Sequence, residues 1–336
     1  MILYAAPMEG ITSYIWRRAH SHWYPGIDKY FTPFLTLGKG KGFKTREKSE
    51  ILPDHNRGLP VVPQILTSRA DDFILMGRRI ADLGYDEMNL NLGCPSPTVV
   101  KKGKGSGFLK DPDTLCRFFE AIFKAGEGLP EKISVKTRLG VEDGCEIRRL
   151  IEIYNQFPFS EVIIHARVQK DLYKGAVRMA DFRDALKASL HPVVYNGDIF
   201  TGADVEKLID HTGYREAEPS GGQVAVERSP GRCEPDGIML ARGLIANPQL
   251  AEMIQTGSRK DILRLKGFHD ELADGYEEIM SGDRNALYKM KEIWSYLLLE
   301  FPEAKKTGKK IRKSVHLQEY RQIVDEWFLS EAENEY

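Results

Sequence analysis

The sequence has few cysteines and no long apolar run. Its four cysteines, Cys94, Cys116, Cys145 and Cys233, form no CxxC pair and lack the spacing of a zinc site. Free thiols in a reducing compartment are therefore expected, without a metal site. No stretch of about 18 apolar residues occurs, so no membrane span is expected. The first ten residues lack the basic region of a secretory signal, and a cytoplasmic location is predicted.

Neither sign of charge is in excess. There are 48 Lys and Arg against 49 Asp and Glu, a net charge of -1, which neither supports nor excludes a nucleic-acid partner. The composition of 42% hydrophobic and 29% charged residues is ordinary for a globular protein and excludes disordered and collagen-like chains. A chain of 336 residues can form two domains, or one large barrel with an appendage.

Short β-rich runs alternate with segments of helical period over most of the chain. Arg69–Leu83 and Asp111–Lys124 are two such helical segments, and Asp111 is the expected N-cap of the second. Alternating strands and helices indicate a parallel sheet, and eight units predict an α/β fold, a (β/α)8 TIM barrel over residues 1–250. The eight runs are Ile2–Ala6, Tyr30–Leu35, Val61–Leu66, Glu87–Leu92, Ile133–Thr137, Val162–His165, Val193–Tyr195 and Gly237–Ala241.

The runs share a second property. Polar, Gly or Pro residues follow seven of them at the carboxyl end, where barrel enzymes carry their active sites. Polar residues end strands in many proteins, which explains a single run but explains seven together poorly.

The pattern changes after residue 250. Three amphipathic helices are predicted, over Ser258–Met280, Asp283–Phe301 and Val315–Leu329, and together they indicate a small all-α domain at 251–336. Pro302 and a basic linker separate the last two helices. The linker places six cations in nine residues, and such a run is most often a solvated face: Lys305, Lys306, Lys309, Lys310, Arg312 and Lys313.

Tyr214–Pro235 interrupts the alternation before the eighth run. It is rich in Gly, Pro, Ser and Glu and falls in a helix-to-strand loop, which lies at the face of a barrel away from the active site. We predict an insertion at about 214–235, a hairpin around Gly221 and Gly222, without a catalytic role.

Cys94 is the first candidate for chemistry. It stands between Gly93 and Pro95 directly after a strand, where no apolar period continues. A thiol there can act as a nucleophile beside a base such as His165, or as a general acid. The following segment, Lys101–Gly107, is basic and rich in glycine, but its glycine spacing fits neither a dinucleotide fingerprint nor a P-loop. A mobile loop that closes over an anionic substrate is expected.

The ends of the seventh and eighth runs favour a phosphate site. Asn196–Asp198 and Ala241–Gly243 occupy the positions at which barrels commonly bind phosphate through backbone N–H groups. With Gln64, Lys136 and His165 facing a ring system, this set describes a pocket for flavin mononucleotide (FMN). Lys136 is the informative member, because a cation beside the flavin N1/C2 edge stabilises the anionic reduced form.

Together these motifs resemble the tRNA-dihydrouridine synthase family. They occur in order along the barrel, and the predicted helical domain is similar to the family's tRNA-binding appendage. The resemblance implies reduction of the C5–C6 bond of particular uridines in tRNA, with FMN as cofactor and NADPH as reductant, by a monomer. The motifs are Ala6–Gly10, Asn89–Ser96, Val135–Arg138, His165–Arg167 with Tyr173 and Gly175, Asn196–Asp198 and Ala241–Gly243.

The resemblance also implies roles for individual residues. Cys94 is the expected catalytic acid, which protonates uracil C5 after hydride transfer to C6. The expected FMN contacts are Pro7, Met8, Gln64, Lys136, His165, Asn196, Gly197, Asp198, Ala241 and Arg242. The expected substrate contacts are Asn91, Arg138, Tyr173 and Arg167, with Lys101, Lys102, Lys104, Lys309, Lys310 and Arg312 as contacts to RNA phosphates.

Three places depart from the family pattern. Pro97 and Thr98 stand where members often have a basic residue, Val168 where a Thr is usual, and Thr32-Pro33 where Thr-Glu is frequent. These departures bear on contacts to the substrate and leave the flavin motifs intact.

Two other functions remain open. One is an FMN barrel reductase of a small pyrimidine or enone, and the helical domain with its cations argues against it. The other is a non-catalytic RNA-binding protein on the same scaffold. Cys94, Lys136 and Arg138 argue against that alternative, because a binding protein has no use for a proton donor above a flavin.

Overall fold

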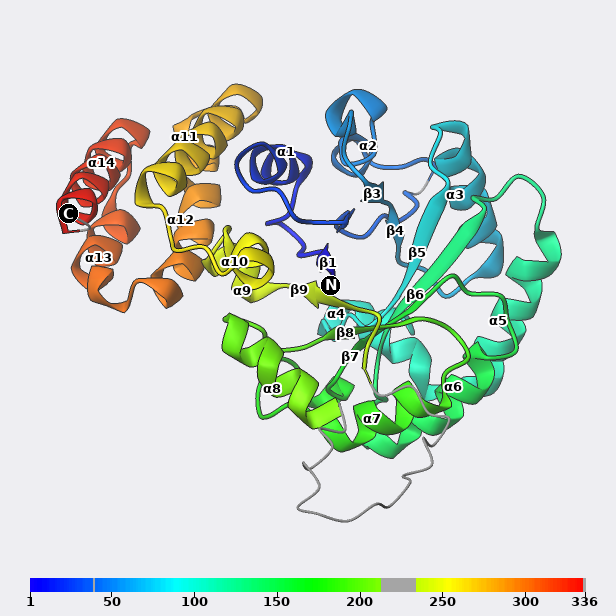
Figure 1. The fold of residues 1–336 in the computed structure, drawn as a ribbon. Coiled ribbons are helices and arrows are strands. Elements are labelled where there is room, and N and C mark those ends of the chain that lie inside the picture. Colours follow the sequence, from blue (N-terminus) through cyan, green and yellow to red (C-terminus); the bar gives the residue numbers. More distant parts are fainter. Residues whose placement is uncertain (39, 213–233, 335–336) are drawn as a thin grey trace, which may run out of the picture.

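The computed structural model describes residues 1–38, 40–212 and 234–334. Its central feature is one sheet in which every neighbouring pair of strands is parallel, in the order β3-β2-β1-β9-β8-β7-β6-β5-β4 (Figure 1). The strands are β1 (Ile2–Ala5), β2 (Lys29–Phe31), β3 (Val61–Val62), β4 (Gln64–Ile65), β5 (Glu87–Leu92), β6 (Lys132–Arg138), β7 (Val162–His165), β8 (Val193–Asn196) and β9 (Gly237–Leu240).

Pro63 explains why eight predicted strands become nine. It separates β3 from β4, because proline has no N–H to continue the hydrogen-bond ladder. β3 pairs with β2 and β4 pairs with β5, so the two ends of the sheet meet at this proline. The sheet therefore closes into a barrel of eight strand positions. This confirms the predicted α/β barrel class and all eight predicted strands.

Helices cover the outside of the barrel, and the two that were predicted in detail are confirmed. Asp111 caps α5 as expected, since its Oδ1 accepts a hydrogen bond from the Thr114 N–H at 3.0 Å. The helices up to the end of the barrel are α1 (Tyr14–Trp23), α2 (Thr45–Ser49), α3 (Ala70–Asp82), α4 (Pro97–Val100), α5 (Pro112–Ala125), α6 (Ile147–Tyr154), α7 (Met179–Ala188), α8 (Gly202–Thr212), α9 (Arg242–Ala246) and α10 (Leu250–Thr256).

The apolar residues of the strands divide between two clusters. The larger cluster lies between the sheet and its helices and continues into the C-terminal helices. The smaller cluster fills the barrel interior, because its strand residues alternate with those that face the helices. Its members are Tyr4, Ala6, Phe31, Val62, Ile163, Val194 and Met239.

The C-terminal helices are α11 (Ile262–Ile279), α12 (Asp283–Glu300), α13 (Lys305–Lys313) and α14 (Leu317–Asn334). The three predicted helices are confirmed, but the expected basic linker is wrong, since Lys305–Lys313 forms α13. Its Ile311 is buried, and Gly308 lies so close to Leu298 that a Cβ would be 2.5 Å from that side chain. The cations therefore occupy the outer face of a packed helix.

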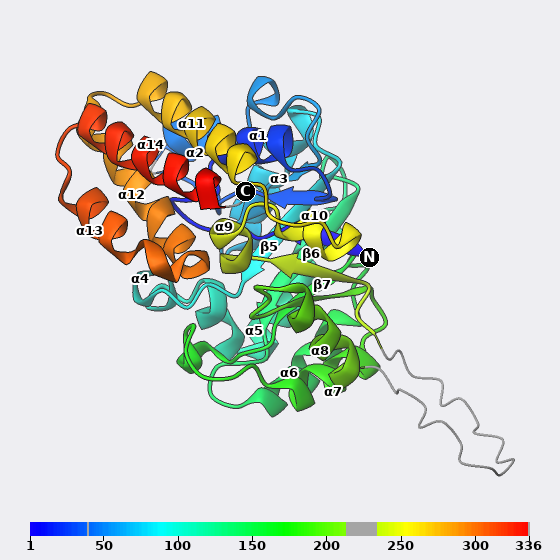
Figure 2. The same cartoon turned by 60° about the vertical axis from the view of Figure 1, so that its left-hand side comes forward.

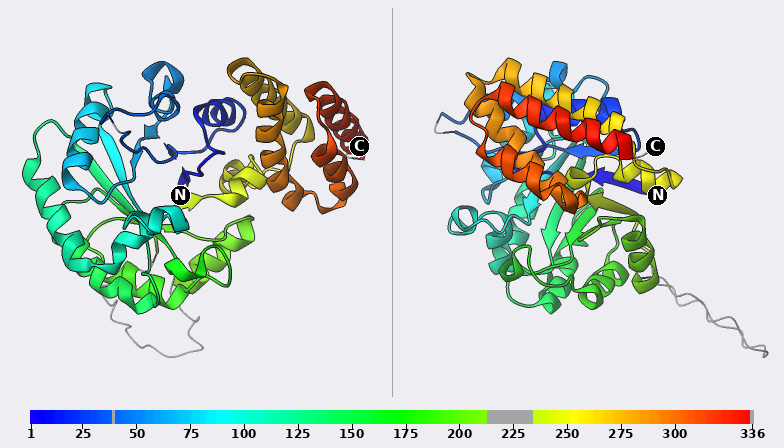
Figure 3. Two further views of the ribbon diagram at one scale, coloured as in Figure 1. Left: turned by 180° about the vertical axis from the view of Figure 1, so that it is seen from behind. Right: turned by 90° about the vertical axis from the view of Figure 1, so that its left-hand side faces the viewer.

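The C-terminal helices pack on the barrel beside α1, as Figures 1 and 2 show and as the view from behind in Figure 3 repeats. Two glycines of α11 make this contact close: a Cβ at Gly267 would be 2.1 Å from Trp23, and one at Gly275 would be 2.9 Å from Ile15. The Ser13 and Tyr276 hydroxyls form a hydrogen bond at 2.9 Å across the same contact. These contacts hold the helical bundle, α11–α14, next to the loop that follows β1.

Three further predictions concern an insertion, membrane spans and metal sites. The predicted insertion at 214–235 lies outside the described residues except for its last two. Within the described ranges no helix is long and apolar enough to cross a membrane. No group of three or more His, Cys, Asp or Glu in those ranges could hold a metal ion, and Cys94, Cys116 and Cys145 are free thiols.

Candidate active site

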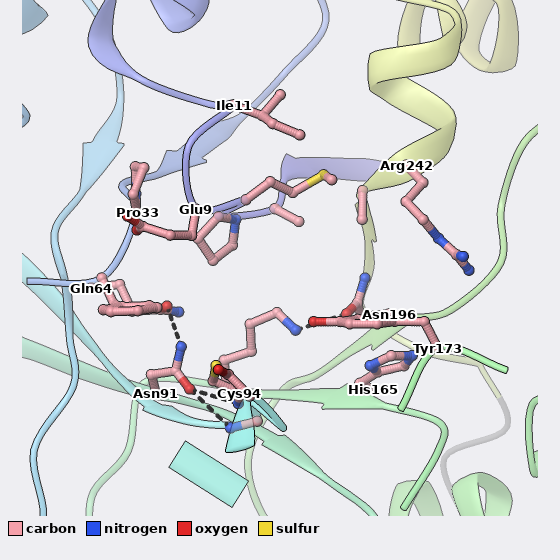
Figure 4. A pocket seen from close by; sticks show the side chains of 18 of the residues that line it. Glu9, Ile11, Pro33, Gln64, Asn91, Cys94, His165, Tyr173, Asn196 and Arg242 are labelled. Atoms are coloured by element: carbon pink, nitrogen blue, oxygen red, sulfur yellow. Dashed lines mark hydrogen bonds between the residues drawn. The ribbon is translucent and has the colours of Figure 1, made fainter. Parts of the chain in front are cut away.

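A pocket of about 680 Å³ opens at the carboxyl ends of the barrel strands (Figure 4). In Figure 4, Gln64 and Asn91 line one side, and His165, Asn196 and Arg242 line the other. Small-molecule sites in proteins commonly have volumes of about 300–1,000 Å³. The pocket therefore has the size of a site for a cofactor together with part of a substrate.

The loop that carries Cys94 is held by two buried side chains. Asn91 Oδ1 accepts hydrogen bonds from the N–H groups of Gly93 and Cys94, at 3.1 and 2.9 Å. Asn91 Nδ2 donates to Gln64 Oε1 at 2.7 Å, and Arg138 Nε donates to the Gly93 carbonyl at 2.8 Å. The thiol of Cys94 is thus presented from a fixed backbone.

The segment Gly105–Gly107 packs against the Cys94 loop and bonds its backbone. Ser106 donates to the Cys94 carbonyl through its N–H at 3.0 Å and its Oγ at 2.9 Å. Gly105, at a φ of +55°, lies so close that a Cβ would be 2.7 Å from the same carbonyl. The expectation of a loose loop over the substrate is therefore wrong for Gly105–Gly107, which is buried against Cys94.

Burial sets the protonation state of the thiol. It raises the pKa of Cys94 above its ordinary value of 9.0, and the positive charges of Arg138 and Lys136 offset this only in part. A thiol with a raised pKa stays protonated at neutral pH, as a proton donor requires.

Lys136 brings a positive charge into the pocket. Its Nζ donates to Asn196 Oδ1 at 2.7 Å, and Asn196 is held in turn by the Met239 carbonyl, which accepts from its Nδ2 at 2.8 Å. Burial and the charge of Arg138 lower the pKa of Lys136 from 10.5 to about 7. The described residues give this amine a neutral partner and no ion pair, so an anionic ligand would stabilise its charged form.

Asp198 organises the arginines at the far end of the pocket. Its carboxylate binds Arg242 at 2.5 Å and the buried Arg167 at 2.5 and 3.1 Å. Arg167 also donates to the Gly175 carbonyl at 2.6 Å. Arg167 therefore supports Asp198 from outside the pocket lining, while Arg242 faces the pocket.

Tyr173 covers the pocket from the β7 loop. Its ring is stacked with His165 at 6.1 Å between centroids and lies 5.3 Å from the Arg138 guanidinium and 5.9 Å from that of Arg242. Burial and the surrounding cations hold the pKa of His165 well below 6.5, so the ring is neutral. The aromatic and cationic groups form a wall suited to an electron-rich planar ring.

The structure brings most of the predicted site together. All ten expected FMN contacts line the pocket, as do Cys94, Asn91, Arg138 and Tyr173. Lys101 and Lys102 lie at the end of α4, where Lys102 and Lys104 border a neighbouring cavity of about 410 Å³. Lys309, Lys310 and Arg312 are exposed on α13. Figure 2 shows α4 and α13 on the side of the molecule toward which β9 points.

Other residues that line the pocket were missed by the sequence analysis. They are Ala6, Glu9, Ile11, Pro33, Phe34, Gly93, Ser96, Thr98, Val99, Glu292 and Tyr296. Several adjoin the motifs and could have been included on that ground. Glu292 and Tyr296 lie on α12, far away in sequence, and no local signal places them near the barrel.

The departures from the family pattern have visible consequences. Val168 still accepts a hydrogen bond from Arg138 Nη1 at 2.9 Å, because the contact uses its carbonyl. Thr32 accepts from the Gln64 N–H at 3.0 Å, and Pro33 joins the pocket wall. These substitutions leave the backbone of the site in place.

Comparisons with known proteins show which family the chain resembles. Residues 4–217 match the family described as dihydrouridine synthase (Dus). The probable tRNA-dihydrouridine synthase of Staphylococcus epidermidis (strain ATCC 12228 / FDA PCI 1200) is 30% identical over 277 residues, 81% of this chain and 78% of that protein. The probable tRNA-dihydrouridine synthase 2 of Bacillus subtilis (strain 168) is 29% identical, with the same two coverages. A solved variant of NCR from Zymomonas mobilis, at 13% identity and a TM-score of 0.47 over 80% of this chain and 93% of its own, is too distant to bear on function.

Proposed function

The chain belongs to the dihydrouridine synthase family and is an oxidoreductase, and we propose on that premise that it reduces the C5–C6 bond of a specific uridine in tRNA. One observation carries the proposal. The thiol of Cys94, which burial keeps protonated, lines the same pocket as the amine of Lys136, whose partner Asn196 is neutral. A proton donor and a cation facing one cavity suit reduction of a polarised double bond.

The residues present fit FMN. Among the described residues, the amine of Lys136 has only a neutral partner, Asn196. The N1/C2 edge of an anionic reduced flavin would supply the negative charge that this amine lacks as a partner. Arg242, oriented by Asp198, stands where a phosphate would be bound, next to Gly197. When it is bound and reduced by NADPH, FMN supplies the hydride for uracil C6. The contacts proposed for it remain Pro7, Met8, Gln64, Lys136, His165, Asn196, Gly197, Asp198, Ala241 and Arg242.

Cys94 supplies the proton. As hydride reaches C6, negative charge develops at C5 and on the C4 carbonyl of uracil, and the thiol proton moves from Cys94 Sγ to C5. The hydrogen bonds from Gly93 and Cys94 to Asn91 keep the thiol in position for this transfer. The thiolate that remains is stabilised by the charges of Arg138 and Lys136.

Arg138 and Tyr173 hold the uracil. Two nitrogens of Arg138 donate to the Gly93 and Val168 carbonyls, and the guanidinium also interacts with the Tyr173 hydroxyl. Held in this way, its positive charge stabilises the negative charge that develops on a uracil carbonyl. Tyr173 closes the pocket above this guanidinium. Both hydrogen-bonding ends of the Asn91 amide contact protein, so we assign its main role to holding the Cys94 loop, with its second N–H left for the base.

The RNA is bound mainly through its phosphates. A uridine must leave its stack to reach the pocket, and the strands on either side of it then lie over the surface around the mouth. Exposed cations follow α4, at Lys101 and Lys102, and occur on α13, at Lys309, Lys310 and Arg312. These cations come from two separate parts of the chain, next to α4 and on α13. Such a spread is what recognition of a folded RNA by its shape requires.

Product analysis tests the function. Unmodified tRNA transcripts are incubated with the FMN-loaded protein and NADPH, digested and examined by mass spectrometry. A gain of two hydrogens at one uridine is the expected result. Reduction of free uracil or of an enone, with tRNA unchanged, would assign the protein to small-molecule reductases instead.

A further inference from the structure

Glu292 is a pocket residue that comes from the helical bundle. It lies on α12, yet it lines the pocket together with Tyr296. Lys289, one turn earlier, donates to the Gly10 carbonyl at 2.6 Å and pairs with Glu292 at 3.4 Å. A Cβ at Gly10 would be 3.8 and 3.9 Å from the two carboxylate oxygens. The carboxylate of Glu292 thus lies beside the loop that follows β1.

This position is across the mouth from the proton donor. Gly10 follows β1 and Cys94 follows β5, and these two strands are separated by β2 and by the strand that Pro63 divides. The Glu292 side chain is 45% exposed. It therefore lies at the rim of the pocket, at the bundle side, and not among the buried polar groups of the floor.

Glu292 is the pocket carboxylate that comes from the C-terminal helices, and it has acceptor capacity to spare. Asp198 is held by Arg167 and Arg242, and Glu9 pairs with Arg46 at 2.9 Å. A carboxylate has about four acceptor sites. In the described part of the chain the Glu292 carboxylate has Lys289 as its one ion-pair partner, and that contact is long.

The chemistry of a nucleotide limits what this carboxylate can bind. A carboxylate repels phosphates, so it must accept a hydrogen bond from a neutral donor. Within an RNA strand a uridine offers two: the uracil N3–H and the ribose 2′-hydroxyl, since its other ribose oxygens are esterified or lie in the ring. The base occupies the interior with Cys94 and Arg138, while the ribose must lie at the rim, where the strand leaves the pocket.

We propose that Glu292 accepts a hydrogen bond from the ribose 2′-hydroxyl of the target uridine, and that the site thereby selects RNA over DNA. The inference rests on the proposed function and adds a specificity residue to it. The 2′-hydroxyl is the group by which proteins distinguish the two nucleic acids. Because Glu292 belongs to the C-terminal helices and its neighbour Lys289 bonds Gly10 of the barrel, the bound ribose would lie where the two parts of the protein meet.

The test compares two substrates in one half-reaction. The protein is reduced with NADPH without oxygen and mixed with a tRNA whose target uridine is either unchanged or replaced by 2′-deoxyuridine, and flavin reoxidation is followed. A hydrogen bond to a charged group corresponds to about a 10- to 100-fold effect, so the wild type should react that much more slowly with the deoxy substrate. Glu292→Ala should react with both at nearly the same rate, and Glu292→Gln, which keeps an oxygen acceptor, should lie between.

Glu303→Gln is the matched control. It removes one negative charge from an exposed position of the same bundle outside the pocket, and it should keep the wild-type ratio. Reduction of the flavin by NADPH should be unchanged in all variants. A Glu292→Ala protein that retains the wild-type ratio overturns the inference, as does a wild type that reacts equally with both RNAs. A wild type that reduces neither RNA refutes the proposed function itself, and that outcome is recognisable without any variant.

Discussion

Replacing Lys136 by methionine should make the flavin-free protein more stable at neutral pH, although it removes a residue of the site. In the folded protein burial and Arg138 lower the pKa of this amine from 10.5 to about 7. The unfolded chain, in which the amine titrates near 10.5, therefore binds a proton between these two pH values that the folded protein does not. Stability rises with pH through that window.

The magnitude follows from the linkage relation. Each pH unit inside the window changes the free energy of unfolding by up to about 1.4 kcal/mol, which gives roughly 3 kcal/mol between pH 7 and 9.5 as an upper limit. Methionine retains the apolar stem and gives up the bond to Asn196, worth about 1 kcal/mol. The variant should therefore gain about 1–3 kcal/mol at pH 7 relative to the wild type.

Urea unfolding of the flavin-free proteins at a series of pH values measures this effect. The difference between wild type and variant should shrink as the pH rises, because the Lys136 amine of the unfolded chain loses its proton as the pH approaches 10.5. The other titrating groups are common to both proteins and cancel in the comparison. Lys132→Met, at the exposed start of the same strand, is the control and should show no such trend. A Lys136→Met protein that is less stable at pH 7, or whose difference from wild type is independent of pH, would refute the reasoning.

Three more predictions concern the remaining parts of the site. Cys94→Ala should bind FMN and be reduced by NADPH normally, while its reoxidation by tRNA falls by about 10²–10⁴-fold, measured by stopped-flow absorbance. Asp198→Asn should cost about 1–2 kcal/mol in the free energy of unfolding and weaken FMN binding, because the buried Arg167 loses its counter-charge while the partly exposed Arg242 is screened by solvent. Replacing Lys309, Lys310 and Arg312 together by Gln should weaken tRNA binding and lower its salt-dependence slope by about 2–3, with FMN content unchanged. Unaltered binding by that triple variant would remove α13 from the RNA interface.

The barrel could be predicted from the sequence because its signals are local. Each strand is a short apolar run followed by polar residues, and the period of each helix is visible over one segment. The division at Pro63 could also have been expected, because the missing N–H of proline is a property of one residue. Residues at the ends of parallel strands meet at one edge, so most of the pocket followed from the strand assignment alone.

The rest depends on contacts between distant segments. Lys305–Lys313 has few apolar residues, and only the packing of Gly308 and Ile311 on its neighbouring helices shows why it is helical. The pocket positions of Glu292 and Tyr296 depend on how α12 packs beside the barrel, which no motif encodes. Asn91 was expected to bind the uracil. Its role in holding the Cys94 loop depends on hydrogen bonds to the Gly93 and Cys94 N–H groups, which the sequence does not show.

The most direct test of the account is the absorbance of the flavin in two successive steps without oxygen. NADPH should bleach the FMN-loaded protein, and unmodified tRNA should then restore the oxidised spectrum, whereas free uridine should not. Restoration by tRNA with dihydrouridine in the product would establish that the Cys94 pocket reduces RNA. A protein that binds no FMN, or whose reduced flavin is unaffected by tRNA, would contradict the central claim.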